Sequence, residues 1–527
     1  MPVTKIFNTI IKTSRWPKLW KTEYVTITPK NKSPESPAEC RNISCTNFLS
    51  KIFESFVLQW SREQVVPKLN QYGGEPGASS TQMLVEVVDD VTSALEDNRA
   101  AVVLSALDFS IAFNRLDHTL CLESFASKGA STEVLALLAS FLTGRNMTVR
   151  VGNDASKPRC VNAGAPKGSV LGCYLFNIGI DSLEEDFQPT NGLLQRNAVE
   201  ETLSRTDDFP VASTPSRVRP STVDAAESPI ANRQHNNFKI LPRVANIPPW
   251  IRKPKDPVFK EGRLKTYKYV DDELNTSVIN MRKASLLMQD GVFFKEVTDL
   301  RTEGILQHIS DRARLSGMKI NALKTNLMCV SAAYSFRPRV SVTLDNQKID
   351  GRDNLKLLGV TVDSDMSFKS HIETISARLR SRTWALAKLR KKGLDQAKLV
   401  KAYTSLIRPV CEYACPAWQS LLTADQSEKL ERQQSQALKN IFVGISASKM
   451  RDKAGIALLS KRREKICSKF SSKCINNIRT RHWFQERRAT TYSRRMNINY
   501  PRYLEPAART NRFRNSPKND LIRLLNK

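Results

Sequence analysis

Two adjacent carboxylates, Asp271 and Asp272, lie between two short runs of β-forming residues, 266–270 and 274–279. This arrangement predicts a β-hairpin whose turn is occupied by acids. An ordinary turn also tolerates aspartate, because the side chain can hydrogen-bond to the nearby backbone. The pair alone therefore fixes a local structure but not a chemistry.

Two other Asp-Asp pairs in the chain serve as an internal comparison. Asp89 and Asp90 fall within a helical pattern of apolar residues, which predicts both acids on the solvated face. Asp207 and Asp208 lie in a stretch rich in Ser, Thr and Pro. Neither pair is flanked by strands, so only the pair at 271–272 has the setting of a functional hairpin.

A third carboxylate, Asp108, follows the short apolar run 101–107, which predicts a buried strand. Acids delivered from separate strand ends provide the hard oxygen ligands that Mg²⁺ prefers. Two such ions about 3.5–4 Å apart can activate a primer 3′-hydroxyl and stabilise departing pyrophosphate. The three acids are therefore candidate metal ligands.

The chain has a net charge of +30, and the excess is concentrated near its end. Residues 461–527 contain 19 Lys and Arg against four Asp and Glu, a net charge of +15. Such a balance favours a polyanionic partner, with nucleic acid ahead of an acidic membrane. Aromatic residues that could stack on bases are interleaved with this charge: Trp483, Phe484, Tyr492, Tyr500, Tyr503 and Phe513.

Targeting and membrane signals are lacking in the sequence. No apolar run approaches the roughly 20 residues that span a bilayer, and residues 1–21 have no continuous apolar core. Ten cysteines without a regular framework favour a reducing compartment, and the spacing of Cys467, Cys474 and His482 matches no common zinc site. These features predict an intracellular protein of the nucleus or cytoplasm, neither secreted nor membrane-bound.

Local patterns predict several elements along the chain. Asn47 is a candidate helix cap, and further helices are expected from Asp117 and Ser131. Residues 187–262 lose apolar periodicity, which predicts a largely disordered insertion. A helix is expected after the acidic hairpin up to Ser316, then a buried hairpin arm at 355–362, and a helical pattern from about His371 to Ile441.

Six segments occur in the order typical of the reverse transcriptases of non-LTR retrotransposons, and the chain resembles this LINE and jockey type family. The resemblance covers nearly the whole chain outside the insertion. The segments are Leu-Asp-Phe-Ser-Ile-Ala-Phe-Asn at 107–114, Gly-Ala-Pro-Lys-Gly-Ser-Val-Leu-Gly at 164–172, Tyr-Val-Asp-Asp at 269–272, Gly-Met-Lys-Ile-Asn at 317–321 with Lys-Thr at 324–325, Leu-Leu-Gly-Val at 357–360, and Ile-Arg-Pro-Val-Cys-Glu-Tyr at 407–413.

The resemblance implies roles for matching residues. Asp108, Asp271 and Asp272 would hold two Mg²⁺ ions, with Mn²⁺ as a substitute. Phe113 would exclude a ribose 2′-hydroxyl, although a plain core phenylalanine is the alternative. The remaining implied contacts are with the nucleotide (Lys30, Arg41, Gly164, Pro166, Gly168 and Lys324) and with the primer, as a primer grip (Leu357, Leu358 and Gly359).

The resemblance also implies an α+β right-hand polymerase fold with a helical, basic C-terminal extension. The expected divisions are fingers at 1–100, a palm at 101–370 containing the insertion, a thumb at 371–445 and a nucleic-acid-binding tail at 446–527. The implied partners are an RNA template, a DNA primer or target and deoxynucleoside triphosphates. The implied reaction is RNA-directed DNA synthesis.

Some positions depart from the family pattern. The family usually has Lys at Ile111, Asp at Asn114 and Gln at Lys167, Pro at Asn42, and Arg near Gly73, where this chain has Glu75. None of these changes removes a metal ligand, but several line the expected template and nucleotide path. The endonuclease that commonly precedes this domain is also not in the sequence.

Two alternatives to an active reverse transcriptase follow. The departures favour an inactive remnant, from a truncated or decaying copy, that only binds RNA or DNA. A viral-type RNA polymerase is disfavoured by Phe113 and by Tyr-Val-Asp-Asp in place of Gly-Asp-Asp.

Overall fold

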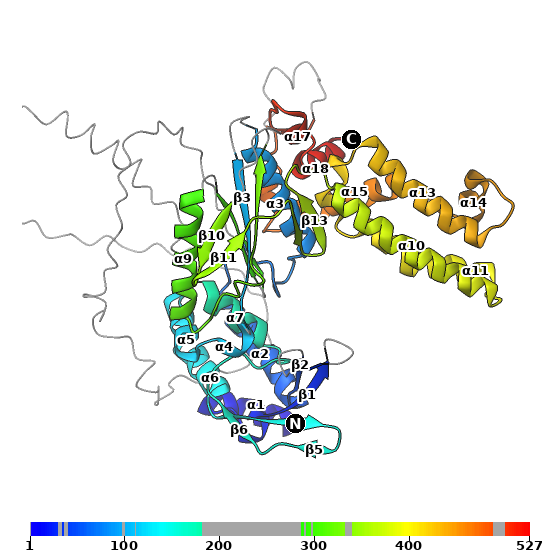
Figure 1. The fold of residues 1–527 in the computed structure, drawn as a ribbon. Helices are drawn as coiled ribbons and strands as arrows, with labels where there is room; N and C mark the ends of the chain where they lie inside the picture. Colours follow the sequence, from blue (N-terminus) through cyan, green and yellow to red (C-terminus); the bar gives the residue numbers. More distant parts are fainter. Residues whose placement is uncertain are drawn as a thin grey trace, which may run out of the picture.

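A computed structural model describes residues 2–29, 34–35, 40–96, 101–110, 112–181, 286–288, 291–296, 299–331, 340–487 and 501–527. Within these ranges only the backbone is described for residues 41, 101, 286–288, 291–296, 299–302 and 447–448. The described parts form an N-terminal lobe, a central sheet flanked by helices, and a long helical arm (Figure 1). The insertion predicted at 187–262 and the acidic pair Asp271-Asp272 lie outside the described residues.

The N-terminal lobe combines helices with a small mixed sheet. Its strands follow the order β2-β1-β4-β5, with β6 also pairing β4, and β1 runs parallel to β4 although more than a hundred residues separate them. Trp16 and Phe53 anchor its core, with ring centroids 5.0 Å apart. The elements are α1 (Pro2–Thr13), η1 (Lys18–Lys21), β1 (Thr22–Pro29), β2 (Cys40–Cys45), α2 (Phe48–Gln64), β4 (Arg145–Val151), β5 (Asp154–Ala155) and β6 (Arg159–Val161).

Side-chain caps begin three helices where the sequence predicts them. Asn47 Oδ1 accepts hydrogen bonds from the backbone N–H groups of Leu49 and Ser50 at the start of α2. Asp117 caps α5 and Ser131 caps α6 in the same way. Each cap satisfies N–H groups that have no partner within the helix, which fixes the first turn. Three helices lie between β3 and β4 in the chain: α4 (Ala112–Arg115), α5 (His118–Ser127) and α6 (Thr132–Leu142).

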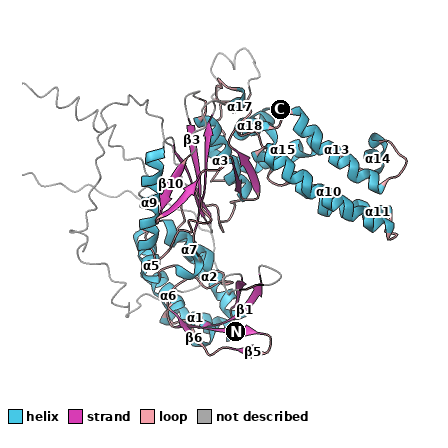
Figure 2. Cartoon of the chain, viewed as in Figure 1, coloured by secondary structure: helices cyan, strands magenta, loops and turns pink. Residues whose placement is uncertain are grey.

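The central sheet is built around β3 (Ala101–Asp108), the buried strand predicted before Asp108. The strand order is β7-β8-β3-β9, and β3 pairs antiparallel with both neighbours. Because side chains alternate along a strand, Val102 and Leu104 face one core with α3, while Val103 and Leu107 face another with α7 and α9. Figure 2 shows α9 and α3 on opposite sides of the sheet, with α7 below it in this view. The bounds are α3 (Ser80–Ala94), α7 (Gly172–Ile180), β7 (Leu286–Met288), β8 (Gly291–Glu296), α9 (Asp299–Leu315) and β9 (Asn326–Ser331).

The helix expected from the acidic hairpin to Ser316 is shorter than predicted. It begins only at Asp299, because the segment before it contributes the paired strands β7 and β8 instead. Six residues of β8 pair with β3, from Glu296 opposite Val103 to Gly291 opposite Asp108. This long-range pairing overrides the local helical pattern.

Two small hairpins lead from the sheet into the helical arm, which matches the helical pattern predicted beyond His371. Figure 1 shows α10 and α13 lying side by side along the arm. The hairpins are β10 (Ser341–Leu344) with β11 (Gln347–Asp350) and β12 (Asn354–Leu357) with β13 (Val360–Asp363). The arm and its base contain α10 (Lys369–Lys391), α11 (Gln396–Ala402), a π-helical turn η6 (Tyr403–Ile407), α12 (Arg408–Glu412), η7 (Cys415–Ala417), η8 (Gln419–Leu421), α13 (Ala424–Ile441), α14 (Ala447–Ala454) and α15 (Leu459–Ile475).

The C-terminal segment returns to the body of the molecule. Its elements η9 (Arg481–Trp483), α17 (Asn511–Arg514) and α18 (Pro517–Asn526) pack near α3 and α15. Trp483, Phe484 and Tyr503 are buried in the main core, so the prediction that they stack on bases is wrong for these three rings. Composition alone could not separate them from exposed platforms, because their burial depends on helices from elsewhere in the chain.

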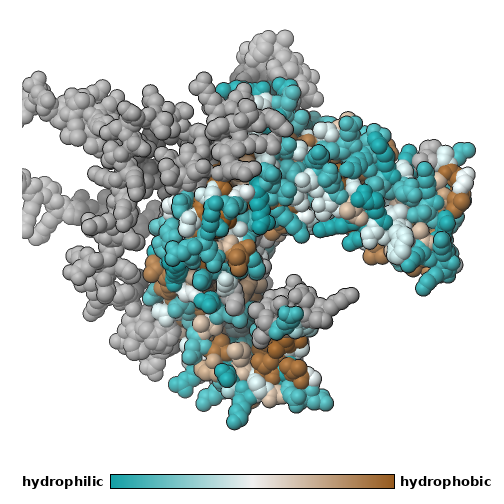
Figure 3. All heavy atoms as spheres, in the orientation of Figure 1, coloured by the Kyte–Doolittle hydropathy of each residue, from teal (hydrophilic) through white to brown (hydrophobic). Residues whose placement is uncertain are grey.

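Figure 3 shows an open hollow between the N-terminal lobe and the helical arm. The arm and upper surface on this face are largely hydrophilic, whereas apolar side chains gather on the N-terminal lobe. That lobe exposes large apolar residues, among them Leu19, Ile43, Phe48 and Phe56. The hollow therefore separates two surfaces of different character.

Asp181, directly after α7, is a buried acid that should make stability depend on pH. Burial raises the pKa of its carboxyl to about 6, although Lys128 Nζ lies 3.1 Å from Oδ2 and Lys68 donates a backbone hydrogen bond to it. Between about pH 4 and pH 6 the folded protein keeps a proton on Asp181 that the unfolded chain has released. The free energy of unfolding is therefore highest below about pH 4 and falls as the pH rises through 6.

We predict that the free energy of unfolding of the parent falls by about 3 kcal/mol between about pH 4 and pH 7 relative to that of the Asp181→Asn variant, which has no carboxyl to titrate. Equilibrium urea unfolding of both chains measures this difference. The same pH dependence in both chains would show that the Asp181 carboxyl titrates as in an unfolded peptide.

Candidate functional site

Asp108 is held at the end of the central strand by neighbours on both sides. Gly291 lies opposite Asp108 on β8. On the other side, the backbone carbonyl of Asp108 accepts a hydrogen bond of 2.7 Å from the Asn321 N–H. The following residues continue this contact, because Phe109 bridges to Ile320 and the Ser110 N–H donates to the Lys319 carbonyl at 2.7 Å. The segment 317–321 predicted to belong to the site therefore lies directly beside Asp108.

Lys324 reaches the same carboxylate from a tight turn after this segment. Its Nζ lies 3.0 Å from Asp108 Oδ2. Oδ2 makes no hydrogen bond of regular geometry, so this contact is an ion pair only. The Lys324 side chain is 67% exposed, and an exposed pair of this kind contributes little and is easily displaced. A shielded carboxylate oxygen with a displaceable counter-ion suits a hard divalent cation.

A glycine-rich loop, 164–172, packs against the segment that follows Asp108. Gly164 has φ +91°, and a Cβ there would lie 2.7 Å from the Phe113 carbonyl oxygen. The loop is held by the Ala165 N–H, which donates to that carbonyl at 2.7 Å, and by a 2.8 Å contact between His118 Nε2 and the Gly164 carbonyl. Only glycine permits this close approach, so the loop and Phe113 are fixed relative to each other.

Phe113 stacks on Phe176 of α7 with ring centroids 4.5 Å apart and an angle of 20° between the rings. The ring is partly buried and packs against two of the cores. Stacking of this kind restricts the ring to one orientation. The structure thus brings Asp108, Lys324, Phe113 and the glycine-rich loop into one region.

The comparison with known proteins identifies the domain that contains this site. Residues 28–216 match the family described as reverse transcriptase (RNA-dependent DNA polymerase). The chain carries a reverse transcriptase domain. The matched stretch contains Asp108, Phe113 and the glycine-rich loop, and it ends before Asp271.

Curated relatives extend the similarity along the chain. The "Probable RNA-directed DNA polymerase from transposon BS" of Drosophila melanogaster is 30% identical over 179 residues, covering 33% of this chain and 19% of that protein. Two others from the same organism are 22% identical: the polymerase from transposon X-element, covering 79% of this chain and 37% of that protein, and the one from mobile element jockey, covering 83% and 39%. The resemblance to non-LTR retrotransposon reverse transcriptases is confirmed, and the chain spans less than half the length of these relatives.

Solved structures give a more distant similarity. Apo telomerase from Candida tropicalis is 10% identical, covers 90% of this chain and 71% of its own, and has a TM-score of 0.38. A TM-score at that level supports no detailed comparison. The expected fold class is instead confirmed by the family match together with the mixed sheet and helices around Asp108.

Other predicted site residues are placed only in part. Arg41 lies in β2 opposite Thr28, but its side chain is not described. Lys30, Asp271 and Asp272 lie outside the described residues. Within the described ranges, no group of three or more His, Cys, Asp or Glu side chains could hold a metal ion, and no helix is long and apolar enough to cross a membrane.

The predicted primer grip forms the tight turn between β12 and β13. Leu357 is buried, whereas Leu358 and Gly359 both adopt left-handed backbone conformations with φ of 47° and 86°. The Tyr413 hydroxyl donates a hydrogen bond of 2.8 Å to the Leu358 carbonyl, and its ring lies against Gly359. Leu358 is strained in this conformation, so Tyr413 helps to hold the turn.

The sequence did not indicate two further residues that support the site. Tyr413 belongs to a segment matched to the family but had no role assigned. Glu54, buried in α2, accepts hydrogen bonds from the Val170 and Leu171 N–H groups at the end of the glycine-rich loop. An acid on the apolar face of a predicted helix was the available signal for Glu54.

We predict that the Tyr413→Phe variant folds normally but raises the KM for primer–template about 5-fold. This is the effect of losing one hydrogen bond worth about 1 kcal/mol to the turn that is predicted to be the primer grip. Primer-extension kinetics measures it. Tyr403→Phe is the matched control, because the Tyr403 hydroxyl contacts Gln434 and not the turn. An equal change in both variants would remove Tyr413 from the primer grip.

Proposed function

We propose that the chain is an RNA-directed DNA polymerase of a non-LTR retrotransposon. It extends a DNA primer or nicked target on an RNA template, using deoxynucleoside triphosphates. The observation that carries the proposal is Asp108, a strand-end carboxylate within a reverse transcriptase domain, with a shielded oxygen beside the cation Lys324. Such a polymerase reaches chromosomal DNA in the nucleus.

The metal ligands in this proposal are Asp108, Asp271 and Asp272. Two Mg²⁺ ions, or Mn²⁺ in their place, would activate the primer 3′-hydroxyl and stabilise the charge that develops on the leaving pyrophosphate. Asp108 has the donor chemistry for this role, because hard cations prefer carboxylate oxygens. Its exposed partner Lys324 can leave the carboxylate when a cation binds there.

The chain's own residues supply binding and positioning. Lys324 stands at the site as a cation that can donate a proton to pyrophosphate, and Lys30 and Arg41 would face the triphosphate. Gly164, Pro166 and Gly168 shape the loop that lies along the template and nucleotide. Leu357, Leu358 and Gly359 direct the primer 3′-end, and Phe113 limits the space beside the sugar.

The domains of the proposal follow the predicted divisions of 1–100, 101–370, 371–445 and 446–527. The helical arm fits a thumb, since α10 and α13 project beyond the sheet that carries Asp108 (Figure 1). The last division is modified, because its aromatic residues Trp483, Phe484 and Tyr503 belong to the core. Nucleic-acid binding by this division would use its exposed basic side chains, such as Arg509 and Arg514.

We predict that Asp108→Asn, Asp271→Asn and Asp272→Asn each reduce primer extension at least about 100-fold, because each removes a metal ligand. The assay uses an RNA template, a DNA primer, deoxynucleotides and Mg²⁺. Asp290→Asn is the matched control, since Asp290 directly precedes Gly291, the residue opposite Asp108. It should retain the activity of the parent.

Two results would change the proposal. Loss of activity in Asp290→Asn but not in Asp271→Asn would show that Asp290, and not Asp271, is a metal ligand together with Asp108. A parent chain no more active than Asp108→Asn would contradict the polymerase, and salt-dependent RNA binding would then support the inactive, nucleic-acid-binding remnant.

We predict that Phe113→Ala lowers the preference for deoxynucleotides over ribonucleotides by about 10-fold or more, because the ring no longer blocks the 2′-hydroxyl. The ratio of kcat/KM values for dCTP and CTP measures the preference. Phe109→Leu is the control, since Phe109 is a buried core ring in the same segment. Equal losses with both nucleotides would make Phe113 a core residue only.

A further inference from the structure

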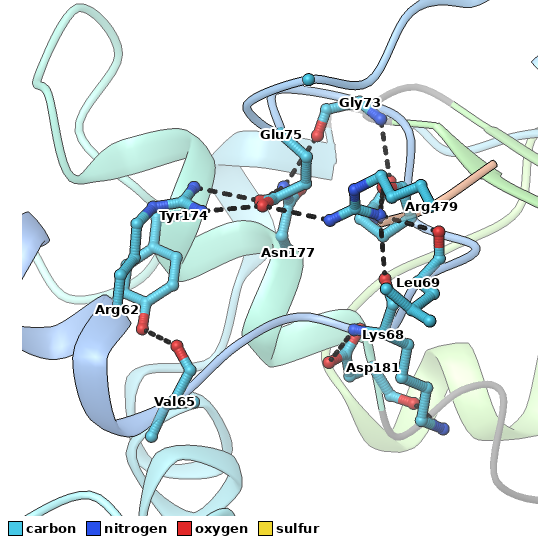
Figure 4. Close-up of polar contacts among 12 residues, drawn as sticks. Arg62, Val65, Lys68, Leu69, Gly73, Glu75, Tyr174, Asn177, Asp181 and Arg479 are labelled. Carbon is cyan, nitrogen blue, oxygen red and sulfur yellow. Dashed lines mark hydrogen bonds and ion pairs between the residues drawn. The ribbon is translucent and has the colours of Figure 1, made fainter. Parts of the chain in front are cut away.

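Arg479, near the C-terminus, inserts its side chain into the loop that connects α2 to α3. The side chain is only 5% exposed. Its Nη1 donates hydrogen bonds to the carbonyls of Leu69 at 2.7 Å and Gln71 at 2.8 Å, and makes a longer one of 3.4 Å to Lys68 (Figure 4). A guanidinium that binds consecutive carbonyls fixes the path of the backbone between them.

The same loop contains Glu75, whose side chain is 1% exposed and anchors the loop to the neighbouring helices. Arg62 of α2 binds it with two hydrogen bonds of 2.8 and 3.2 Å, and Arg479 Nη2 lies 3.6 Å away. Asn177 of α7 donates to Glu75 Oε1 and to the Gly73 carbonyl, each at 2.7 Å. Figure 4 shows these groups converging on the Glu75 carboxylate.

The network reaches the proposed polymerase site through α7. This helix begins at Gly172, the last residue of the glycine-rich loop, and carries Phe176, on which Phe113 stacks. Asn177 is the next residue along, so a displacement of loop 68–77 would be transmitted to α7. Because Arg479 and Glu75 are buried, loss of Arg479 removes the donor to the Leu69 and Gln71 carbonyls and leaves Arg62 as the remaining cation at Glu75.

The C-terminal segment also contacts α3 at separate points beyond Arg479. Asp89, predicted to be solvated, is instead buried, and it accepts a 2.7 Å hydrogen bond from Ser516 Oγ. Lys518 Nζ lies 3.4 Å from Asp89 and 3.8 Å from Asp90. Thr510 Oγ1 donates to Glu96 at 2.6 Å. The basic segment therefore uses part of its charge within the protein.

We propose that Arg479 is a positioning residue of the polymerase site. It fixes loop 68–77 and, through Asn177, sets the placement of α7 and of the glycine-rich loop that binds template and nucleotide. This inference rests on the proposed function for its kinetic consequence, whereas the effect on the loop is independent of activity. The C-terminal segment then acts as part of the polymerase body.

The test compares Arg479→Gln and Arg479→Lys with Arg481→Gln in the full chain. Arg481 is the matched control, because it lies two residues away and is exposed. Hydrogen exchange should show about 10-fold faster exchange at the amides of Gln71, Gly73 and Ala78 in Arg479→Gln. Arg479→Lys should fall between this variant and the parent, since lysine keeps the charge but has only one nitrogen to serve both the carbonyls and Glu75.

Kinetics provides the second measurement. In Arg479→Gln the KM for primer–template and nucleotide should rise about 10-fold while kcat stays within about twofold, because binding surfaces move but the metal ligands do not. Partial recovery in Arg479→Lys supports the proposal. If Arg479→Gln does not fold, as judged by circular dichroism, Arg479→Lys carries the same measurements.

Two results would overturn the inference. One is a hydrogen-exchange rate at loop 68–77 and at α7 that is the same in Arg479→Gln as in Arg481→Gln. Where Arg479→Gln does not fold, the same comparison is made with Arg479→Lys. The other is a fall in kcat with unchanged KM, which would indicate damage elsewhere in the site. A parent without polymerase activity would contradict the proposed function and with it the kinetic part, whereas the exchange data would still decide whether Arg479 fixes the loop.

Discussion

The pairing of β3 with strands on both sides is the constraint on which the site depends. Because β3 lies between β8 and β9, its side chains must face one core or the other, and its end cannot shift in register without exposing both sets. Asp108 follows directly from this register. The segment 319–321 then pairs with residues 108–110, which brings Lys324 within reach of the carboxylate.

The two cores on either side of β3 link the site to different parts of the molecule. The core with α3 continues into the β12–β13 hairpin, the helical arm and the C-terminal helices. The core with α7 and α9 continues to Phe176, which supports Phe113. The strand therefore couples the proposed primer grip on one side with the proposed nucleotide gate on the other, since both pack on elements that contact the same strand.

Local sequence signals predicted the local features well. The caps Asn47, Asp117 and Ser131 begin helices as expected, and the apolar run before Asp108 is a buried strand. The signals failed where contacts cross several hundred residues. Asp89 and Ser516 are 427 positions apart, and the helical pattern around Asp89 gave no sign that another segment would cover it. Charge and aromatic content near the C-terminus were misleading for the same reason.

The departure from the family pattern at Glu75 takes a different meaning in the structure. An arginine usual in this region would stand beside Arg62 and Arg479, and three neighbouring cations in this largely buried setting would repel one another. Glutamate instead places a carboxylate between the two arginines, offsets part of their charge and accepts a hydrogen bond from Asn177. A residue compensated by a partner about 400 positions away is part of a consistent network. Departure at Glu75 is therefore no argument that the copy is decaying.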